Sequence, residues 1–147
     1  MRRLVVLALA PILIMLAACG ASAATANARA LEIAAITTAT AGDAIALASE
    51  SSAARECPAE RPDVDACLDA LAVGWAPVDR AFGLLRSSLG AWYATSVALR
   101  AGEFDLSIAL TAAQAYAEAY AALALVALDR GLRLPALPTL GSLGGAQ

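Results

Sequence analysis

The 147-residue sequence contains no histidine and no lysine, and these two absences exclude a large part of protein chemistry. Histidine is the commonest general base and metal ligand, and lysine is a frequent alternative base or nucleophile. All ten basic residues are arginines, against 13 acidic residues, so the formal net charge is −3. Since positive charge does not accumulate to neutralise phosphates, we expect no nucleic-acid binding.

Aromatic residues are also scarce, at 5% of the chain, whereas hydrophobic residues make up 61%. Alanine alone contributes 41 residues. Because alanine loses no side-chain entropy in a helix, and because runs of β-branched residues are few, this composition predicts an all-α protein. The hydrophobic fraction exceeds the roughly 45–50% of ordinary proteins, which argues against a disordered chain.

The N-terminal segment has the layout of an export signal. Arg2 and Arg3 form a short basic region, and an apolar run follows from residue 4 to residue 16. At about 13 residues, this run is too short to cross a bilayer stably as a helix. The motif at its end, Leu16-Ala17-Ala18-Cys19-Gly20, resembles the lipobox of bacterial lipoproteins.

The resemblance to bacterial lipoproteins implies a cleaved signal peptide over residues 1–18 and a diacylglycerol on the thiol of Cys19. The mature protein would then be anchored by several acyl chains, including palmitate, each buried methylene contributing roughly 0.8 kcal/mol. Because Gly20 rather than an acid follows the cysteine, the resemblance favours the outer membrane of a bacterial envelope, facing the periplasm. The alternative is a plain secretory signal or an uncleaved anchor in which Cys19 is incidental.

Two further cysteines, Cys57 and Cys67, allow one intramolecular pairing between them. The segment between them, residues 58–63, contains two prolines and several charged residues, which predicts a turn. In an oxidising compartment, a disulfide would clip the end of one helix to the start of the next and stabilise the fold by roughly 2–3 kcal/mol. A redox pair is the less favoured alternative, because the spacing is not C-x-x-C and no flanking base lowers a thiol pKa.

Apolar residues recur every three or four positions in three long segments, which predicts helices over residues 28–56, 63–101 and 104–130. Mostly small residues line the first segment, large ones the second, and alanine, tyrosine and leucine the third. In chain order, the expected buried positions are Leu31, Ala34, Thr38, Ala41, Ile45, Ala48 and Ser52; Val64, Leu68, Leu71, Trp75, Val78, Phe82, Leu85, Leu89, Trp92, Ser96 and Leu99; and Leu106, Ala109, Ala113, Tyr116, Tyr120, Leu123 and Ala127.

The three segments predict an antiparallel up-down-up three-helix bundle over residues 28–131. In the second helix pair, positions whose numbers add to 205 face one another, so Trp92 meets a small alanine, as close packing requires. In the first pair, either Ala41 or Ala48 faces Trp75, and the positions of the two cysteines favour Ala48.

Pro77 lies inside the second segment and predicts a kink or break near residues 73–77. Gln114 and Glu118 disfavour a membrane span in the third segment. Two alternatives to the bundle are a helical hairpin with a loose first helix and a coiled coil formed with a partner chain. Tryptophan and phenylalanine at core positions suit a bundle better than a thin coiled coil.

The segments that flank the predicted bundle are rich in small residues. Residues 19–27 are expected to form a tether between the lipid and the first helix. The Pro/Gly-rich tail, residues 132–147, is interpreted as disordered. The alternative is that its recurring leucines dock on the bundle or on a partner.

The sequence shows no catalytic constellation, and we expect no bound metal and no cofactor. Asp65 and Asp69 are one helical turn apart and could chelate a cation weakly. More often, such acids simply stabilise the positive N-terminal end of a helix. We therefore expect a non-enzymatic, lipid-anchored envelope protein with a structural or protein-interaction role, its partners being the membrane and another envelope protein. The alternative is a carrier of a lipid or other apolar ligand between the helices. Five aromatic residues would contact that ligand or partner, or else simply form the core: Trp75, Phe82, Trp92, Tyr116 and Tyr120.

Overall fold

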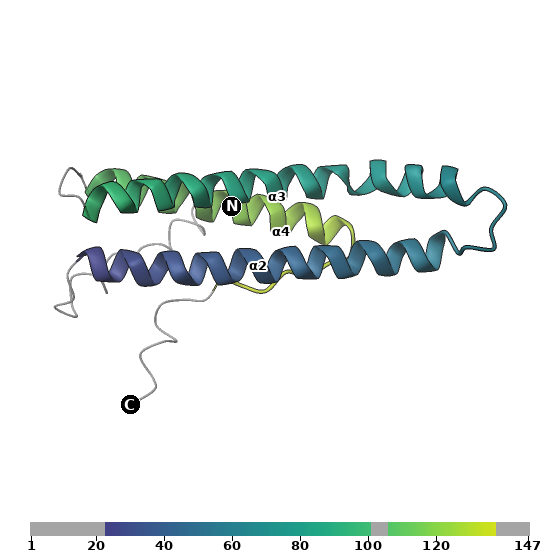
Figure 1. Ribbon diagram of the computed structural model, residues 1–147, viewed down its shortest axis with the longest axis horizontal. Coiled ribbons are helices and arrows are strands. Elements are labelled where there is room, and N and C mark those ends of the chain that lie inside the picture. The colour runs from purple at the N-terminus through teal and green to yellow at the C-terminus, as the bar shows by residue number, and fades with distance from the viewer. Residues whose placement is uncertain (1–22, 101–105, 138–147) are drawn as a thin grey trace, which may run out of the picture.

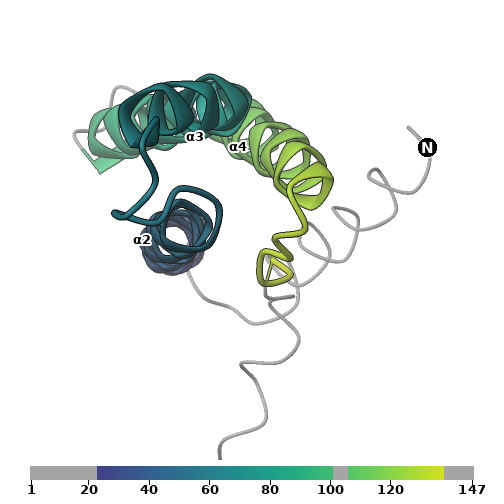
Figure 2. The same cartoon turned by 90° about the vertical axis from the view of Figure 1, so that its right-hand side faces the viewer.

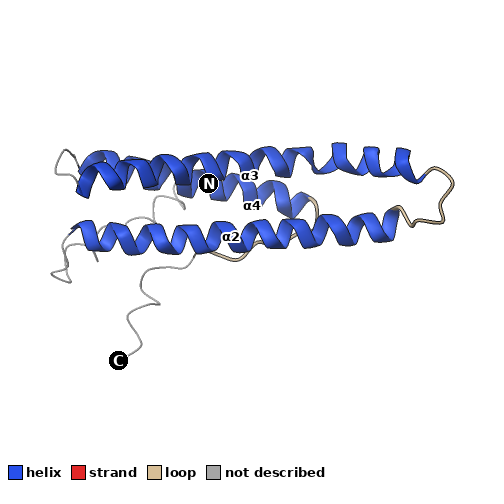
Figure 3. Cartoon of the chain, viewed as in Figure 1, coloured by secondary structure: helices blue, strands red, loops and turns tan. Residues whose placement is uncertain are grey.

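The computed structural model describes residues 23–100 and 106–137, which contain three α-helices (Figure 1). These are α2 (Ala23–Glu56), α3 (Val64–Arg100) and α4 (Leu106–Asp129). No strand occurs in these two ranges, so the prediction of an all-α three-helix bundle is confirmed (Figure 3).

Helix α2 begins at Ala23, so the prediction that residues 23–27 belong to an irregular tether was wrong. Alanine has the highest helix propensity and fills much of this stretch, which favours extension of the helix in the N-terminal direction. Asn27 then joins the buried face of α2, one turn before Leu31. The described part of the helix therefore begins four residues after Cys19.

Helix α3 runs through Pro77 without interruption, although Figure 1 shows a local irregularity of its coil toward the N-terminal end. A proline removes the hydrogen bond to the carbonyl four residues earlier, which belongs here to Val73. The side chain of Val73 is 74% exposed, so this part of the helix faces solvent, where water can satisfy the freed carbonyl. The predicted kink region is thus accommodated within one helix.

Helix α4 ends in a hydrogen-bonded C-cap centred on Gly131. The amide of Gly131 donates to the carbonyl of Leu128, and the amide of Leu132 donates to the carbonyl of Ala127. This 6→1 pattern needs a residue in the left-handed region, and Gly131 has a φ of 75°. A glycine adopts that angle without a Cβ clash, so it stops the helix here.

The helices differ in how closely they pack. Helix α3 packs against both α2 and α4, whereas α2 and α4 contact each other at few places. Cys57–Cys67 and Asn27–Ser96 join opposite ends of α2 and α3, which makes that pair antiparallel. Figure 2 shows the consequence end-on, with α2 and α4 both against α3 and the chain after α4 lying between them.

That segment, residues 132–137, is packed on the bundle, which corrects the prediction of disorder for this part of the tail. Leu132, Leu134 and Leu137 are half-buried against the core, and the hydroxyl of Tyr120 donates to the carbonyl of Pro135. We call residues 132–137 the strap. It docks because the α2–α4 side of the bundle would otherwise expose core side chains. The rest of the predicted tail, residues 138–147, lies outside the described residues.

The core coincides with the three predicted apolar faces. Every described position of the predicted α2 and α4 faces is buried or half-buried, and on α3 only Leu68 is classed as exposed, at 40%. Leu99 and Leu106 lie outside the described side chains. The largest fully buried side chains are Leu85, Leu123 and Val78.

Candidate functional site

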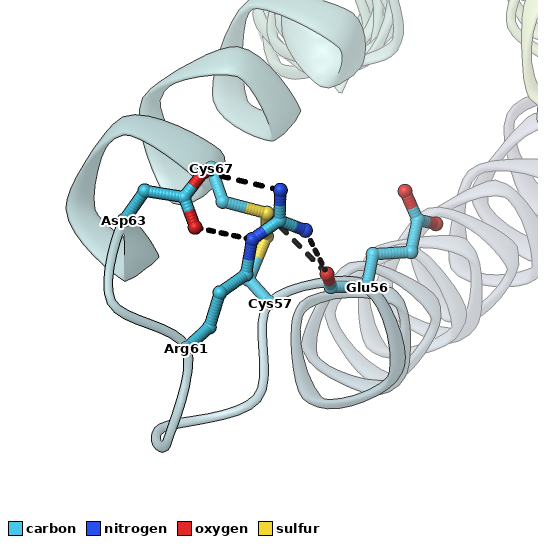
Figure 4. The surroundings of a disulfide bond; sticks show 5 residues. All are labelled: Glu56, Cys57, Arg61, Asp63 and Cys67. Carbon is cyan, nitrogen blue, oxygen red and sulfur yellow. Dashed lines mark hydrogen bonds and ion pairs between the residues drawn. A yellow bond between two sulfur atoms is a disulfide. The ribbon is translucent and has the colours of Figure 1, made fainter.

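The disulfide lies where α2 ends and α3 begins. Cys57 and Cys67 are bonded, with Cα atoms 5.7 Å apart, as the sequence predicted (Figure 4). Arg61 lies in the turn between them, donates to both carboxylate oxygens of Asp63 and also donates to the carbonyl of Glu56 at 3.2 Å. It therefore caps the C-terminus of α2 while it holds the start of α3.

Charge in this turn is partly paired. The hydrogen bond from Arg61 lowers the pKa of the Asp63 carboxyl. The sulfur of Cys67 lies 3.4 Å from the carbonyl oxygen of Glu56, but a disulfide sulfur has no proton to donate, so this is a contact only. Asp65 and Asp69 are exposed, and the described residues contain no group of three or more metal-ligating side chains.

The disulfide end extends beyond α4. The guanidinium of Arg130, just after α4, donates to the carbonyl of Gly74, which is ten residues into α3. About 15 Å of the α2–α3 pair therefore continues without a third helix (Figure 1). We call this two-helix extension, with its disulfide and turn, the tip.

Four of the five predicted aromatic contact residues belong to the closed core. Trp75, Trp92, Tyr116 and Tyr120 are each at most 6% exposed. The rings of Trp92 and Tyr116 have centroids 5.7 Å apart, and those of Tyr116 and Tyr120 are 6.5 Å apart. Such tilted pairs stabilise a core and leave no space between the rings for a ligand. Only Phe82 lies at an open groove, described below.

The hydroxyl of Tyr116 joins α4 to α2. It lies 2.9 Å from the carbonyl oxygen of Ala34 and 3.0 Å from the hydroxyl of Thr38, which itself lies 2.8 Å from that carbonyl. Either hydroxyl can donate to the carbonyl of Ala34, whose oxygen has two lone pairs, and either can donate to the other hydroxyl. Burial raises the pKa of Tyr116, while the hydrogen bond with Thr38 opposes this shift.

A second polar cluster joins the start of α2 to α3. The indole nitrogen of Trp92 donates to the side-chain oxygen of Asn27 at 2.9 Å, and the side-chain nitrogen of Asn27 donates to the hydroxyl of Ser96 at 2.7 Å. The Ser96 hydroxyl donates in turn to the carbonyl of Trp92. Asn27 was missed because the helix was predicted to start after it, although it continues the same heptad face as Leu31.

An apolar groove runs between α2 and α3. It has a volume of about 580 Å³ and is open to solvent. It lies beside Phe82, whose ring would be 2.9 Å from a Cβ at Gly42, so these two positions pack face to face. Its lining residues are Leu31, Ala35, Thr38, Ala39, Phe82, Arg86, Leu89, Gly90 and Tyr93. The sequence did not single out this groove, because only Leu31, Thr38, Phe82 and Leu89 of its lining belong to the predicted core faces and the rest lie beside them.

Membrane-related features of the chain are of two kinds. Cys19 and the signal segment lie outside the described residues. By length and composition, residues Thr25–Glu56 and Ser107–Asp129 could each cross a membrane. Such helices also occur in bundle cores, and both contribute buried side chains to the shared core of this chain.

No protein-family model, curated protein or solved structure shows significant similarity to this chain.

Proposed function

We propose that this chain is a lipid-anchored protein of a bacterial envelope, whose helical bundle has a structural or protein-interaction role without catalysis. The observation that carries the proposal is the lipobox-like motif ending at Cys19, at the end of an apolar run of signal length. The outer membrane, facing the periplasm, is the favoured location because Gly20 follows the cysteine.

The start of α2 supports a close attachment of the bundle to the membrane. Ala23 is four residues after Cys19, and four residues span at most about 14 Å. With 34 residues, α2 is about 50 Å long, so the tip would lie well away from the anchored end. We infer that the tip is the end of the bundle presented to a partner protein.

Lipid attachment is tested by metabolic labelling with radioactive palmitate. The wild-type chain should be labelled, Cys19→Ala should not, and Cys57→Ala, which changes a cysteine outside the motif, should be labelled as strongly as wild type. Continued labelling of Cys19→Ala would refute the anchor. Absence of label in the wild type would refute it as well.

A partner role is tested by placing a photo-crosslinking side chain at Val73, which is 74% exposed near the tip, and at Ile36, which is 61% exposed on α2. Crosslinking in intact cells should give a discrete adduct at position 73, recovered again in a pull-down from solubilised envelopes. Adducts of equal yield at both positions, or none at position 73, would contradict a partner-facing tip.

The packing does not favour the alternative of a carrier with its ligand between the helices. Trp75, Trp92, Tyr116 and Tyr120 fill the space that such a ligand would need. Phe82 alone faces a groove, and that groove is on the outside of the bundle.

A further inference from the structure

The groove between α2 and α3 has a lining suited to part of a single apolar chain. Its walls run from Leu31 to Ala39 on α2 and from Phe82 to Tyr93 on α3, which corresponds to about 12 Å and 16 Å of helix. Its volume of about 580 Å³ falls within the roughly 300–1,000 Å³ of typical ligand pockets.

The groove exists because three of its positions carry little or no side chain. Ala35 and Ala39 line it from α2, and Gly90 lines it from α3. A Cβ at Gly90 would meet nothing within 4 Å, so close helix packing does not require a glycine there. Glycine inside a helix destabilises it by roughly 0.5–1 kcal/mol relative to alanine. At position 90 the missing side chain leaves space in the groove.

The charge of the groove comes from one residue. Arg86 is the only ionisable side chain of either sign in its lining apart from the hydroxyl of Tyr93, and it is exposed. Within the described ranges Arg86 makes no ion pair, and neither Glu32 nor Asp43 on α2 is paired with it. An apolar slot beside an unpaired guanidinium is complementary to an amphiphile that has one apolar chain and an anionic head.

We propose that this groove binds a long-chain fatty acid, with part of the acyl chain along the apolar lining between α2 and α3 and the carboxylate paired with Arg86. No covalent step is involved. The site is distinct from the aromatic core and does not require the lipid on Cys19, so it goes beyond the proposed function.

The experiment uses the full chain in phosphatidylcholine nanodiscs and a palmitic acid that carries a photo-reactive group in its chain. Because the chain has no lysine, trypsin cuts after arginine alone and separates the groove from α4. Label should appear in peptides Ala30–Arg55, Ala81–Arg86 and Ser87–Arg100, and should be weak in Ala101–Arg130, although Leu125 and Leu128 of that peptide are exposed.

Two pairs of variants separate the site from general hydrophobicity. Gly90→Leu fills the groove, whereas Gly83→Leu changes a glycine of the same helix that also has nothing within 4 Å but does not line the groove. Gly90→Leu should lower labelling at least about fivefold and Gly83→Leu should not, while helix propensity makes both at least as helical as wild type. Arg86→Gln should lower labelling by the acid several-fold, and Arg80→Gln should not.

The photo-reactive methyl ester of the same acid tests the carboxylate. It should label the wild type several-fold less than the acid does, and Arg86→Gln should not weaken its labelling. Equal labelling of Gly90→Leu and Gly83→Leu, a preference for Ala101–Arg130, or equal labelling by acid and ester would each overturn the proposal. Cys19→Ala should keep the photo-labelling while it loses metabolic palmitate, so failure of the groove and failure of the anchor give different results.

Discussion

Arg130 donates a hydrogen bond to the carbonyl of Gly74, and this contact fixes the level at which α4 ends along α3. A Cβ at position 74 would lie 3.0 Å from the guanidinium carbon of Arg130 and closer still to one of its nitrogens. The absence of a side chain at Gly74 therefore allows the guanidinium to reach the helix backbone.

Replacing Gly74 with alanine should therefore raise the free energy of unfolding less than the same replacement at a glycine with no neighbouring atoms. Gly83→Ala should stabilise the chain by about 0.5–1 kcal/mol through helix propensity, because nothing lies within 4 Å of its Cβ position. Gly74→Ala gains the same propensity but displaces Arg130, so its net gain in urea unfolding should be smaller. In an Arg130→Ala background the two glycine substitutions should become equal; equality in the wild-type background would contradict the contact.

Loss of the disulfide should act mainly on the tip. Replacing both Cys57 and Cys67 with serine should lower the free energy of unfolding by roughly 2–3 kcal/mol, because the ten-residue separation closes a short loop. Hydrogen exchange should accelerate most before Gly74, where α4 no longer supports α3. Uniform acceleration over all three helices would show that the disulfide does not act locally.

Asn27 should contribute to stability through Trp92. Asn27→Ala leaves the indole N–H without its acceptor and should cost about 1–2 kcal/mol in urea unfolding. Asn27→Asp keeps the acceptor but loses the donor to Ser96, so its cost should be smaller, and the NMR shift of the indole proton should change less. Equal costs for the two variants would show that the bond to Trp92 is not the main contribution.

Alkaline pH should destabilise the bundle through Tyr116. Its pKa is raised in the folded chain, so the unfolded chain loses this proton first as the pH rises. The associated stability is fully present below the ordinary pKa of about 10 and declines above it until the raised pKa of the folded state is passed. The urea midpoint of Tyr116→Phe should fall less steeply above pH 10 than that of wild type. Tyr93→Phe, at a side chain that is 61% exposed, is the matched control for the loss of a tyrosine hydroxyl.

Much of the bundle follows from side-chain periodicity. The disulfide at Cys57–Cys67 and the packing of Gly42 against Phe82 both join positions whose numbers add to 124, so one register holds along α2 and α3. This register places Ala48, rather than Ala41, level with Trp75. Regular helices preserve spacing over many turns, and one known pair therefore places the others.

Most of the features that the sequence did not predict depend on contacts between distant parts of the chain. The strap has no regular secondary structure, and its half-buried leucines pack against the helical core from outside the helices, so no local pattern encodes those contacts. The predicted first residue of α2 was too far along the chain, because alanines next to a predicted cleavage site resemble a linker. The groove forms where small residues of α2 and α3 face one another, so predicting it requires the register of the two helices as well as their composition.

The early end of α4 also has a mechanical consequence. The resistance of a rod to bending rises steeply with its thickness, and the molecule narrows from three helices and the strap to two helices beyond Gly74 (Figure 1). Bending under load would concentrate in that thin part. The disulfide prevents α2 and α3 from sliding past one another there, so the two helices flex together as one beam and transmit force from the turn to the thicker body.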